Sequence, residues 1–176
     1  MGKETVSELI SERELQDRID GLAAEITRDY SGCDLVLVGL LKGAVIFMSD
    51  LARKIDMHVE FDFMDISSYG SESESSGNIK INKDLENSIE GKDVLLVEDI
   101  IDTGRTLEHI LKHLRRQNPK SLRICALLDK PDRRVIEGIQ ADYTGFSIPD
   151  KFVVGYGLDY AQRYRNLRYI AVVELN

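Results

Sequence analysis

Apolar and polar residues follow one another along the chain in blocks that predict alternating helices and strands. Ser11 and Glu14 form a capping box in front of apolar residues at helical spacing, which predicts a helix of about five turns ending near residues 31–32. The next three elements are predicted as a buried strand at 35–38, a turn at 39–43 and a mostly apolar helix at 44–55.

The segment after this second helix has the pattern of a hairpin. Apolar residues alternate with acids over 59–63, which predicts a strand with one face in solvent that leads to Ser68 and Tyr69. Residues 70–77 contain only Gly, Ser and Glu and predict a mobile loop, and an apolar alternation resumes at 79–81. The loop is therefore expected at the tip of a long hairpin, where it is either a plain linker or a lid over a site.

The rest of the chain is organised around the stretch 94–107. Its first four residues are apolar and predict a strand buried on both faces, which runs into two acids, Glu98 and Asp99. A polar turn of small residues follows at 102–106, and the apolar residues beyond it have the spacing of one helix face. Further strands are predicted at 122–128, 141–146, 152–156 and 170–173.

This order of elements predicts an α/β fold in a single domain that spans residues 1–176. Strands and helices alternate through the first two thirds of the chain, which is typical of a mostly parallel, twisted sheet flanked by helices on both faces. In such sheets, ligands bind beyond the carboxyl ends of the strands, at the point where the strand order reverses. The segments 39–43, 98–106 and 129–130 all fall at such ends.

Composition narrows the range of partners. The 176 residues include 31 acidic and 23 basic ones, and the formal net charge of −8 disfavours general attraction to nucleic acid or to anionic membranes. We find no apolar run suited to a signal peptide or a membrane span, and the two cysteines lack partners at metal-ligand spacing, so buried thiols in a cytoplasmic protein are expected. A small anionic substrate would need local cations, and the candidates are Lys42, Arg105, Lys130, Lys151, Arg163 and Arg165.

A phosphate-binding loop and two carboxylates adjoin in the central stretch. A loop of small residues that leads into a helix presents several backbone N–H groups toward one point, and Gly104 lets an anion approach them. Capping of the helix by Asp102 or Thr103 is the alternative explanation of this loop. The carboxylates of Glu98 and Asp99 are costly at an apolar strand end unless a divalent cation or the vicinal hydroxyls of a sugar pair with them. A ribose 5-phosphate unit would satisfy both features.

The sequence VLLVEDIIDTGRTL at 94–107 closely resembles the phosphoribosyl-pyrophosphate motif of the type I phosphoribosyltransferases. The resemblance extends over roughly residues 35–173, most of the chain. The segments that resemble the hypoxanthine-guanine branch in particular are 41–43, 68–69 with its loop, 128–130, and above all IPDKFVVGYGLDY at 148–160 with Arg165 beyond it.

The resemblance implies a type I phosphoribosyltransferase fold with a small hood formed by the C-terminal segment and a flexible hairpin loop. It implies a purine salvage transferase that moves the 5-phosphoribosyl group from phosphoribosyl pyrophosphate to N9 of hypoxanthine or guanine. The implied products are IMP or GMP and pyrophosphate, and the implied cofactor is Mg²⁺. Because relatives form dimers and tetramers, a homo-oligomer is expected, with apolar surface on the second predicted helix as a candidate contact.

Residue roles follow from the resemblance at the matching positions. Asp102 is the implied catalytic acid/base at purine N7, although a carboxyl with an ordinary pKa of ~3.9 is a weak base unless burial raises it. The peptide bond between Leu41 and Lys42 is implied to be cis, and an ordinary left-handed turn at Gly43 is the alternative. The full set of implied roles is 5-phosphate binding by Asp102, Thr103, Gly104, Arg105 and Thr106; ribose binding by Glu98 and Asp99; pyrophosphate binding by Lys42, Gly43 and Arg165; purine binding by Lys130, Phe152, Val153 and Asp159; lid closure by Ser68 and Tyr69; and metal binding by Glu98, Asp99 and Asp159.

Base selectivity rests on the implied role of Lys130 as a donor to the 6-oxo group. This donor would face the amino donor of adenine, which favours hypoxanthine and guanine. Considered alone, Phe152 is typical of a core residue, Arg165 of a solvated surface, and Asp159 of a capping residue.

Three other functions fit parts of the pattern. A regulatory protein that senses phosphoribosyl pyrophosphate and binds RNA or DNA is disfavoured by the acidic charge and the lack of a basic extension. A receiver-type phosphorelay domain places acids at strand ends but requires neither the turn at 102–106 nor the segment 148–160. A phosphoribosyltransferase specific for xanthine or adenine would differ only at the C2 and C6 edges of the base, so the preference among hypoxanthine, guanine and xanthine stays open.

Overall fold

The computed structural model describes residues 4–68 and 79–175, and the predicted lid residue Tyr69 and most of its loop lie outside these ranges. A six-stranded sheet forms the centre, in the order β4-β3-β2-β5-β6-β7. The pairings between β2, β3, β5, β6 and β7 are parallel, and β4 joins β3 in antiparallel fashion, so the predicted sheet and hairpin are confirmed. The strands are β2 (Leu35–Leu41), β3 (Val59–Ser68), β4 (Ile79–Lys83), β5 (Asp93–Ile101), β6 (Ser121–Asp129) and β7 (Tyr143–Ser147).

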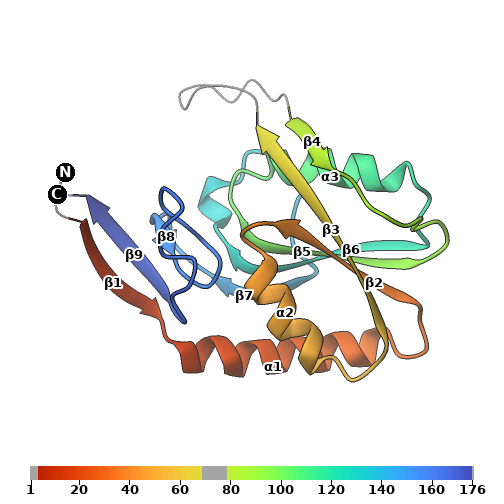
Figure 1. The fold of residues 1–176 in the computed structure, drawn as a ribbon, viewed down its shortest axis with the longest axis horizontal. Coiled ribbons are helices and arrows are strands. Elements are labelled where there is room, and N and C mark those ends of the chain that lie inside the picture. Colours follow the sequence, from red (N-terminus) through yellow and green to blue (C-terminus); the bar gives the residue numbers. More distant parts are fainter. Residues whose placement is uncertain (1–3, 69–78, 176) are drawn as a thin grey trace.

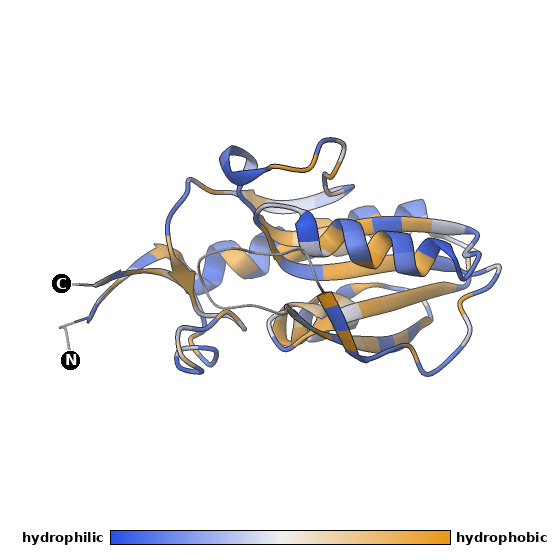
Figure 2. Cartoon of the chain, turned by 90° about the horizontal axis from the view of Figure 1, so that it is seen from above, coloured by the Kyte–Doolittle hydropathy of each residue, from blue (hydrophilic) through white to orange (hydrophobic). Residues whose placement is uncertain are grey.

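Helices cover both faces of this sheet (Figure 1). On one face, α1 (Glu12–Asp29) and α2 (Val45–Lys54) pack with Leu95 and Val97 of β5. On the other face, α3 (Arg105–Arg115) packs with Val94 and Leu96 of the same strand. Successive residues of a strand point to opposite faces, so four consecutive apolar residues serve two hydrophobic cores. Figure 2 shows the resulting apolar strands between more polar outer helix faces.

Local sequence signals set the helix ends. The Ser11 hydroxyl accepts from the Glu14 N–H at 3.3 Å, and the Ser11 N–H donates to the Glu14 carboxylate at 2.8 Å, so the predicted capping box is present. Among the described residues, no helix is both long and apolar enough to cross a membrane.

A second sheet of three strands, in the order β1-β9-β8, forms the hood at one end of the molecule (Figure 1). Its strands are β1 (Glu4–Ile10), β9 (Ile170–Leu175) and β8 (Val153–Val154). The strand β1 was not predicted from the sequence, because its residues are mostly polar and exposed and its partner β9 lies at the other end of the chain. The predicted strand at 152–156 is shorter than expected, because the chain enters the left-handed region at Gly155.

Two other expectations were wrong in detail. The strand β2 continues to Leu41, so the turn predicted at 39–43 begins only at Lys42. On β3 the expected solvent face is reversed locally, with Phe61 52 % exposed and Asp62 6 % exposed. Asp62 is buried because it accepts hydrogen bonds from the backbone N–H groups of Phe63 at 2.7 Å and Glu86 at 2.8 Å. Both cysteines are free thiols: Cys125 is buried as expected, and Cys33 is half-buried.

Candidate active site

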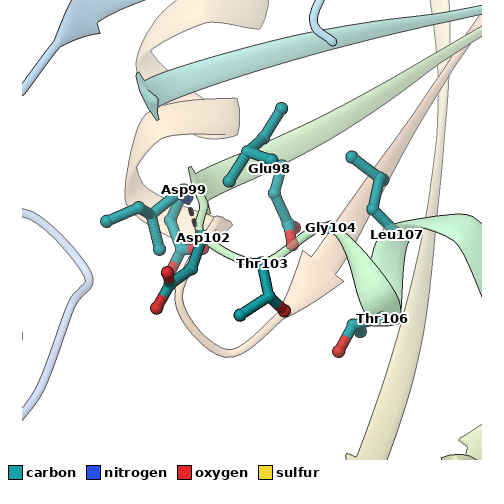
Figure 3. A pocket seen from close by; sticks show the side chains of 9 residues that line it. Glu98, Asp99, Asp102, Thr103, Gly104, Thr106 and Leu107 are labelled. Atoms are coloured by element: carbon teal, nitrogen blue, oxygen red, sulfur yellow. Dashed lines mark hydrogen bonds between the residues drawn. The ribbon is translucent and has the colours of Figure 1, made fainter. Parts of the chain in front are cut away.

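A gap between β2 and β5 forms the centre of the candidate site. The two strands pair only as far as Gly39 and Val97, although each continues beyond that point. The strand order reverses here, because β3 lies on one side of β2 and β5 and β6 on the other. A pocket of about 470 Å³, open solvent included, is lined by residues 98–104, Thr106 and Leu107 (Figure 3).

Residues 102–104 and 106 of the predicted phosphate-binding loop line this pocket. Helix α3 begins at Arg105, and its N-cap is Gly104 at φ 85°, which has no side chain to cap the helix. Of the two capping residues expected as the alternative, Thr103 accepts a long hydrogen bond from the Arg105 N–H at 3.5 Å through its hydroxyl, whereas the Asp102 carboxylate accepts from Arg133. Orphan N–H groups at the start of a helix bind anions, and the helix dipole adds partial positive charge. Figure 3 shows the side chains of Thr103 and Thr106 beside this helix start.

The two acids of β5 also line the pocket, together with an adjoining pocket of about 370 Å³ that includes Gly43 and Ile66. Burial, and then the neighbouring Asp99, raises the pKa of Glu98 well above its usual value. Burial also raises the pKa of Asp99, to about 6, although a hydrogen bond from the Ile100 N–H opposes the shift. In the described part of the chain neither carboxylate forms an ion pair, so both are available to a cation or a hydroxyl-bearing ligand.

The turn after β2 lies directly against these acids. The peptide bond between Leu41 and Lys42 is cis, as expected, and Gly43 has no left-handed φ, so the alternative of an ordinary turn there is wrong. A Cβ atom on Gly43 would lie 1.7 Å from Oδ2 of Asp99, so any larger residue at this position would displace the Asp99 carboxylate. The Lys42 side chain is exposed.

Arg165 reaches the same region from the hood. Its guanidinium donates to the Gly157 carbonyl at 2.7 Å and pairs with Asp159 at 2.8 Å. The Nε atom of Arg165 is buried and has no hydrogen-bond partner among the described residues. Arg165 therefore does not belong to a freely solvated surface, and its unpaired donor fits an anionic ligand. Asp159 also accepts from the Gln162 N–H at 2.8 Å, so it has a local turn contact as well as the ion pair.

Of the residues implied in base binding, Lys130 contacts the end of β5, whereas Phe152 and Val153 lie in the hood. Lys130 is buried, its N–H donates to the Ile101 carbonyl at 2.9 Å, and its ammonium group lies 3.6 Å from Asp150. Phe152 is 53 % exposed, so it is not a core residue, and its ring meets Tyr160 edge-on at 5.6 Å. Val153 is buried in β8 and pairs with Val172.

Sequence reasoning missed two residues beside Asp102. The Nε of Arg133 donates to the Asp102 carboxylate at 3.0 Å, and the Nε of Arg134 donates to the Asp102 carbonyl at 3.2 Å. Arg133 also lies 3.8 Å from Asp150, which links Asp102 to Lys130 through charged groups. The sequence signal that could have indicated them is the pair Arg133 and Arg134, which follows Lys130 at the end of a strand. Of the earlier cation candidates, Arg163 is engaged by Glu4 in the hood.

A metal ion would draw only part of its ligands from this chain. The described residues contain no group of three or more His, Cys, Asp or Glu side chains that could hold an ion, so Glu98, Asp99 and Asp159 do not form one shared cage. Mg²⁺ is usually held by one or two carboxylates together with substrate phosphates and water. Two half-buried carboxylates with raised pKa values, next to the predicted phosphate-binding loop, fit that mode.

Comparison with known proteins gives consistent matches. The family described as the phosphoribosyl transferase domain matches residues 5–161. The chain is 52 % identical over 166 residues to the hypoxanthine-guanine phosphoribosyltransferase of Bacillus subtilis, covering 94 % of this chain and 92 % of that protein. It is also 54 % identical over 166 residues to the bifunctional protein TilS/HprT of Listeria monocytogenes, but it spans only 26 % of that relative's length.

A solved structure agrees with these sequence matches. The hypoxanthine phosphoribosyltransferase of Staphylococcus aureus superimposes with a TM-score of 0.92 at 51 % identity, covering 96 % of this chain and 91 % of that one.

Proposed function

Because the chain belongs to the phosphoribosyl transferase domain family, we propose that it is a Mg²⁺-dependent hypoxanthine/guanine phosphoribosyltransferase of purine salvage. It transfers the 5-phosphoribosyl group from phosphoribosyl pyrophosphate to N9 of hypoxanthine or guanine, and it releases IMP or GMP and pyrophosphate. The names of the relatives support this reaction, and the residues around the β2–β5 gap supply its chemistry.

One observation carries the proposal: the turn that leads into α3 lines a single pocket together with two acids that form no ion pair among the described residues. A ribose 5-phosphate contains a phosphate and a sugar diol, and the pocket offers binding groups for both. The backbone N–H groups and hydroxyls of residues 102–106 bind the 5-phosphate, while Glu98 and Asp99 accept hydrogen bonds from the ribose hydroxyls.

Glu98 and Asp99 would also hold Mg²⁺, and Asp159 would hold a second ion. The bound metal would supply positive charge opposite the departing pyrophosphate. Lys42 and Arg165 bind pyrophosphate oxygens directly, and the unpaired Nε of Arg165 supports this role.

At the base end, Asp102 takes the proton from purine N7 as N9 bonds to the anomeric carbon. The guanidinium of Arg133, 3.0 Å from its carboxylate, orients the acceptor. Phe152 offers an exposed ring face for stacking on the purine. Lys130 donates to the 6-oxo group, and Val153 and Asp159 border the remaining purine edge. Adenine is rejected because its amino group would face the lysine donor.

Closure by Ser68 and Tyr69 excludes water from the reacting centre. We also propose that the chain works in the cytoplasm, which its two free thiols support. It is proposed to form a dimer or tetramer, and the exposed Val45 on α2 and Phe61 on β3 provide apolar surface for such contacts.

The test is a turnover assay with Mg²⁺, phosphoribosyl pyrophosphate and one base at a time, followed by ultraviolet absorbance. We expect product with hypoxanthine or guanine and none with adenine, and the xanthine arm measures the preference at C2. The absence of turnover with both hypoxanthine and guanine would contradict the proposal. Omitting Mg²⁺ or adding a chelator is expected to abolish the rate.

A further inference from the structure

The chain takes a rare path between β8 and the segment that carries Arg165. Gly155, Tyr156 and Gly157 are consecutive residues with φ values of 97°, 51° and 104°. A left-handed φ is uncommon for a bulky side chain, and it persists only where the surroundings hold it. None of the roles proposed above explains why a tyrosine stands in the middle of this turn.

The Tyr156 side chain ties the turn to both helices on one face of the sheet. It is 4 % exposed, and its hydroxyl donates to Oδ2 of Asp50 on α2. Nε2 of Gln16 on α1 donates to the same hydroxyl at 3.2 Å and to Asp50 at 3.3 Å. Burial alone would raise the pKa of Asp50, but hydrogen bonds from Tyr156, Gln16 and Arg53 outweigh it and lower the pKa. Asp50 is therefore an ionised acceptor, which makes a strong hydrogen bond with the hydroxyl.

The neighbouring Gly157 is wedged between the two groups assigned to pyrophosphate. Its N–H donates to the Arg165 carbonyl at 2.9 Å, and its own carbonyl accepts from the Arg165 guanidinium at 2.7 Å. A Cβ atom on Gly157 would lie 2.1 Å from the Gly43 carbonyl oxygen, so the two backbones are in direct contact. A shift of the turn would move Arg165 relative to Gly43.

Helix α2 connects these contacts into one unit. It begins shortly after Gly43 and carries Asp50 in its middle, so the pyrophosphate turn and the anchor of Tyr156 belong to the same rigid element. The hood carries Arg165, and the tyrosine hydroxyl joins the hood to that element.

We propose that Tyr156, held by Asp50, is a positioning residue that sets the spacing between Gly43 and Arg165 and thereby the affinity for pyrophosphate groups. This inference rests on the proposed function. It assigns a role to the tyrosine of the GYG turn, which touches no substrate itself.

The test uses Tyr156→Phe, which removes only the hydroxyl. Losing a hydrogen bond to a charged group is expected to raise the KM for phosphoribosyl pyrophosphate and the Kd of pyrophosphate by about tenfold. The KM for the base is expected to stay within about twofold of the wild type, because the base end is held by other contacts. Calorimetric binding of pyrophosphate with Mg²⁺ provides a readout that does not depend on turnover.

Tyr143→Phe is the matched control. Tyr143 is also 4 % exposed, and its hydroxyl donates to Asp29 at 2.9 Å and accepts from Arg123 at 3.2 Å. Tyr143 joins α1 to the edge strand β7, away from Gly43 and Arg165. Removing its hydroxyl is therefore expected to lower the Tm without changing the KM for phosphoribosyl pyrophosphate.

Two variants of Asp50 separate positioning from folding. Asp50→Ala is expected to raise the KM for phosphoribosyl pyrophosphate as Tyr156→Phe does. Asp50→Asn keeps an acceptor oxygen, so its KM is expected to stay within about threefold of the wild-type value. An unchanged KM in Tyr156→Phe and Asp50→Ala, or an equal rise in Tyr143→Phe, would overturn the inference while leaving an active wild type and the proposed function intact. A wild type that neither turns over nor binds phosphoribosyl pyrophosphate would overturn both.

Discussion

Strand β5 carries acids at both ends, and their surroundings differ sharply. At the amino-terminal end, Asp93 is 6 % exposed but accepts from the Ser121 hydroxyl at 2.6 Å and from the Lys120 ammonium at 3.1 Å. Burial alone would raise the pKa of Asp93, but these hydrogen bonds outweigh it and lower the pKa. At the carboxyl end, burial dominates and raises the pKa of both Glu98 and Asp99.

The difference separates a structural acid from candidate ligand-binding acids on one strand. Asp93 has partners in Ser121, the first residue of β6, and in Lys120 just before it, and it stabilises the fold as a carboxylate. Glu98 and Asp99 lie where β2 and β5 no longer pair, and among the described residues neither carboxylate has a cationic partner; Asp99 accepts only backbone N–H donation, from Ile100. Groups left unsatisfied in this way are typical of binding sites, where a ligand completes them.

The largest effect on activity is expected from Asp102, which is an exception to the distinction between paired structural acids and unpaired ligand-binding acids. It has a partner in Arg133, yet we propose that it acts in catalysis. Asp102→Ala is expected to lower kcat by about a thousandfold, within the range for loss of a general base, while binding of phosphoribosyl pyrophosphate is largely kept. Steady-state kinetics and calorimetry measure the two effects. An undiminished kcat would mean that Asp102, like Asp93, has only a structural role.

Asp99→Asn is expected to lower kcat/KM for phosphoribosyl pyrophosphate by about a hundredfold, because a charged ligand of the ribose and Mg²⁺ is lost. The same change is expected to raise the Tm of the free protein near neutral pH. The folded-state pKa of Asp99, about 6, exceeds its unfolded value, so the folded state binds the proton more tightly. The stability gain of the variant is therefore largest above about pH 6 and shrinks as the pH falls toward about 4. A Tm that falls in this variant would contradict the contrast.

Much of the central sheet could be predicted from the sequence, because its strands are continuous apolar runs and its turns are marked by small polar residues. The acids at 98–99 and the loop at 102–106 could be found for the same reason, since they interrupt apolar strands with charge. The hood strand β1 could not, because only its pairing with β9 makes it a strand. A sequence pattern also cannot distinguish Asp93 from Asp99, because their partners come from other elements.

The burial of Asp62 could not be predicted for the same reason, because its partners come from another segment of the chain. Alternation predicted a solvent-exposed acid, but backbone donors from the distant segment 86–87 bury it. The arginine beside Asp102 was missed because Arg133 lies far along the chain, on a short 3₁₀ turn (Pro131–Arg133). The residues that line the pocket could be predicted from the sequence, whereas the contacts that orient Asp102 could not.

A smaller effect is expected from Phe152, because an exposed aromatic ring differs from a buried one as an unpaired acid differs from a paired one. Phe152 is an aromatic ring left 53 % exposed, unlike the buried rings of the core. Phe152→Ala is expected to raise the KM for hypoxanthine by about tenfold, which corresponds to the loss of one stacking contact, with little change in Tm. Kinetics with varied base and a thermal melt measure both. A large fall in Tm with an unchanged KM would make Phe152 a packing residue.

The smallest effect on activity is expected from Asp93→Asn, which is the matched control for Asp99→Asn. The variant is expected to keep kcat/KM within about twofold of the wild type and to lose about 1–3 kcal/mol of stability, since it breaks a buried charged network. Because the folded-state pKa of Asp93 is lowered, the wild type loses this stability as the pH falls through that pKa, and the variant does not. Denaturant unfolding at several pH values provides the measurement, and a loss of activity without a loss of stability would contradict the contrast.

The most direct test of the central claim is a count of the protons released when phosphoribosyl pyrophosphate and Mg²⁺ bind. The measurement is calorimetry at about pH 6 in two buffers of different ionisation enthalpy, because the pKa of Asp99 is about 6 and part of its carboxyls are then protonated. The ligand needs the ionised carboxylate, so the wild type and Asp93→Asn are expected to release more protons than Asp99→Asn. Equal proton release in all three proteins would contradict the assignment of the unpaired acids to the ligand.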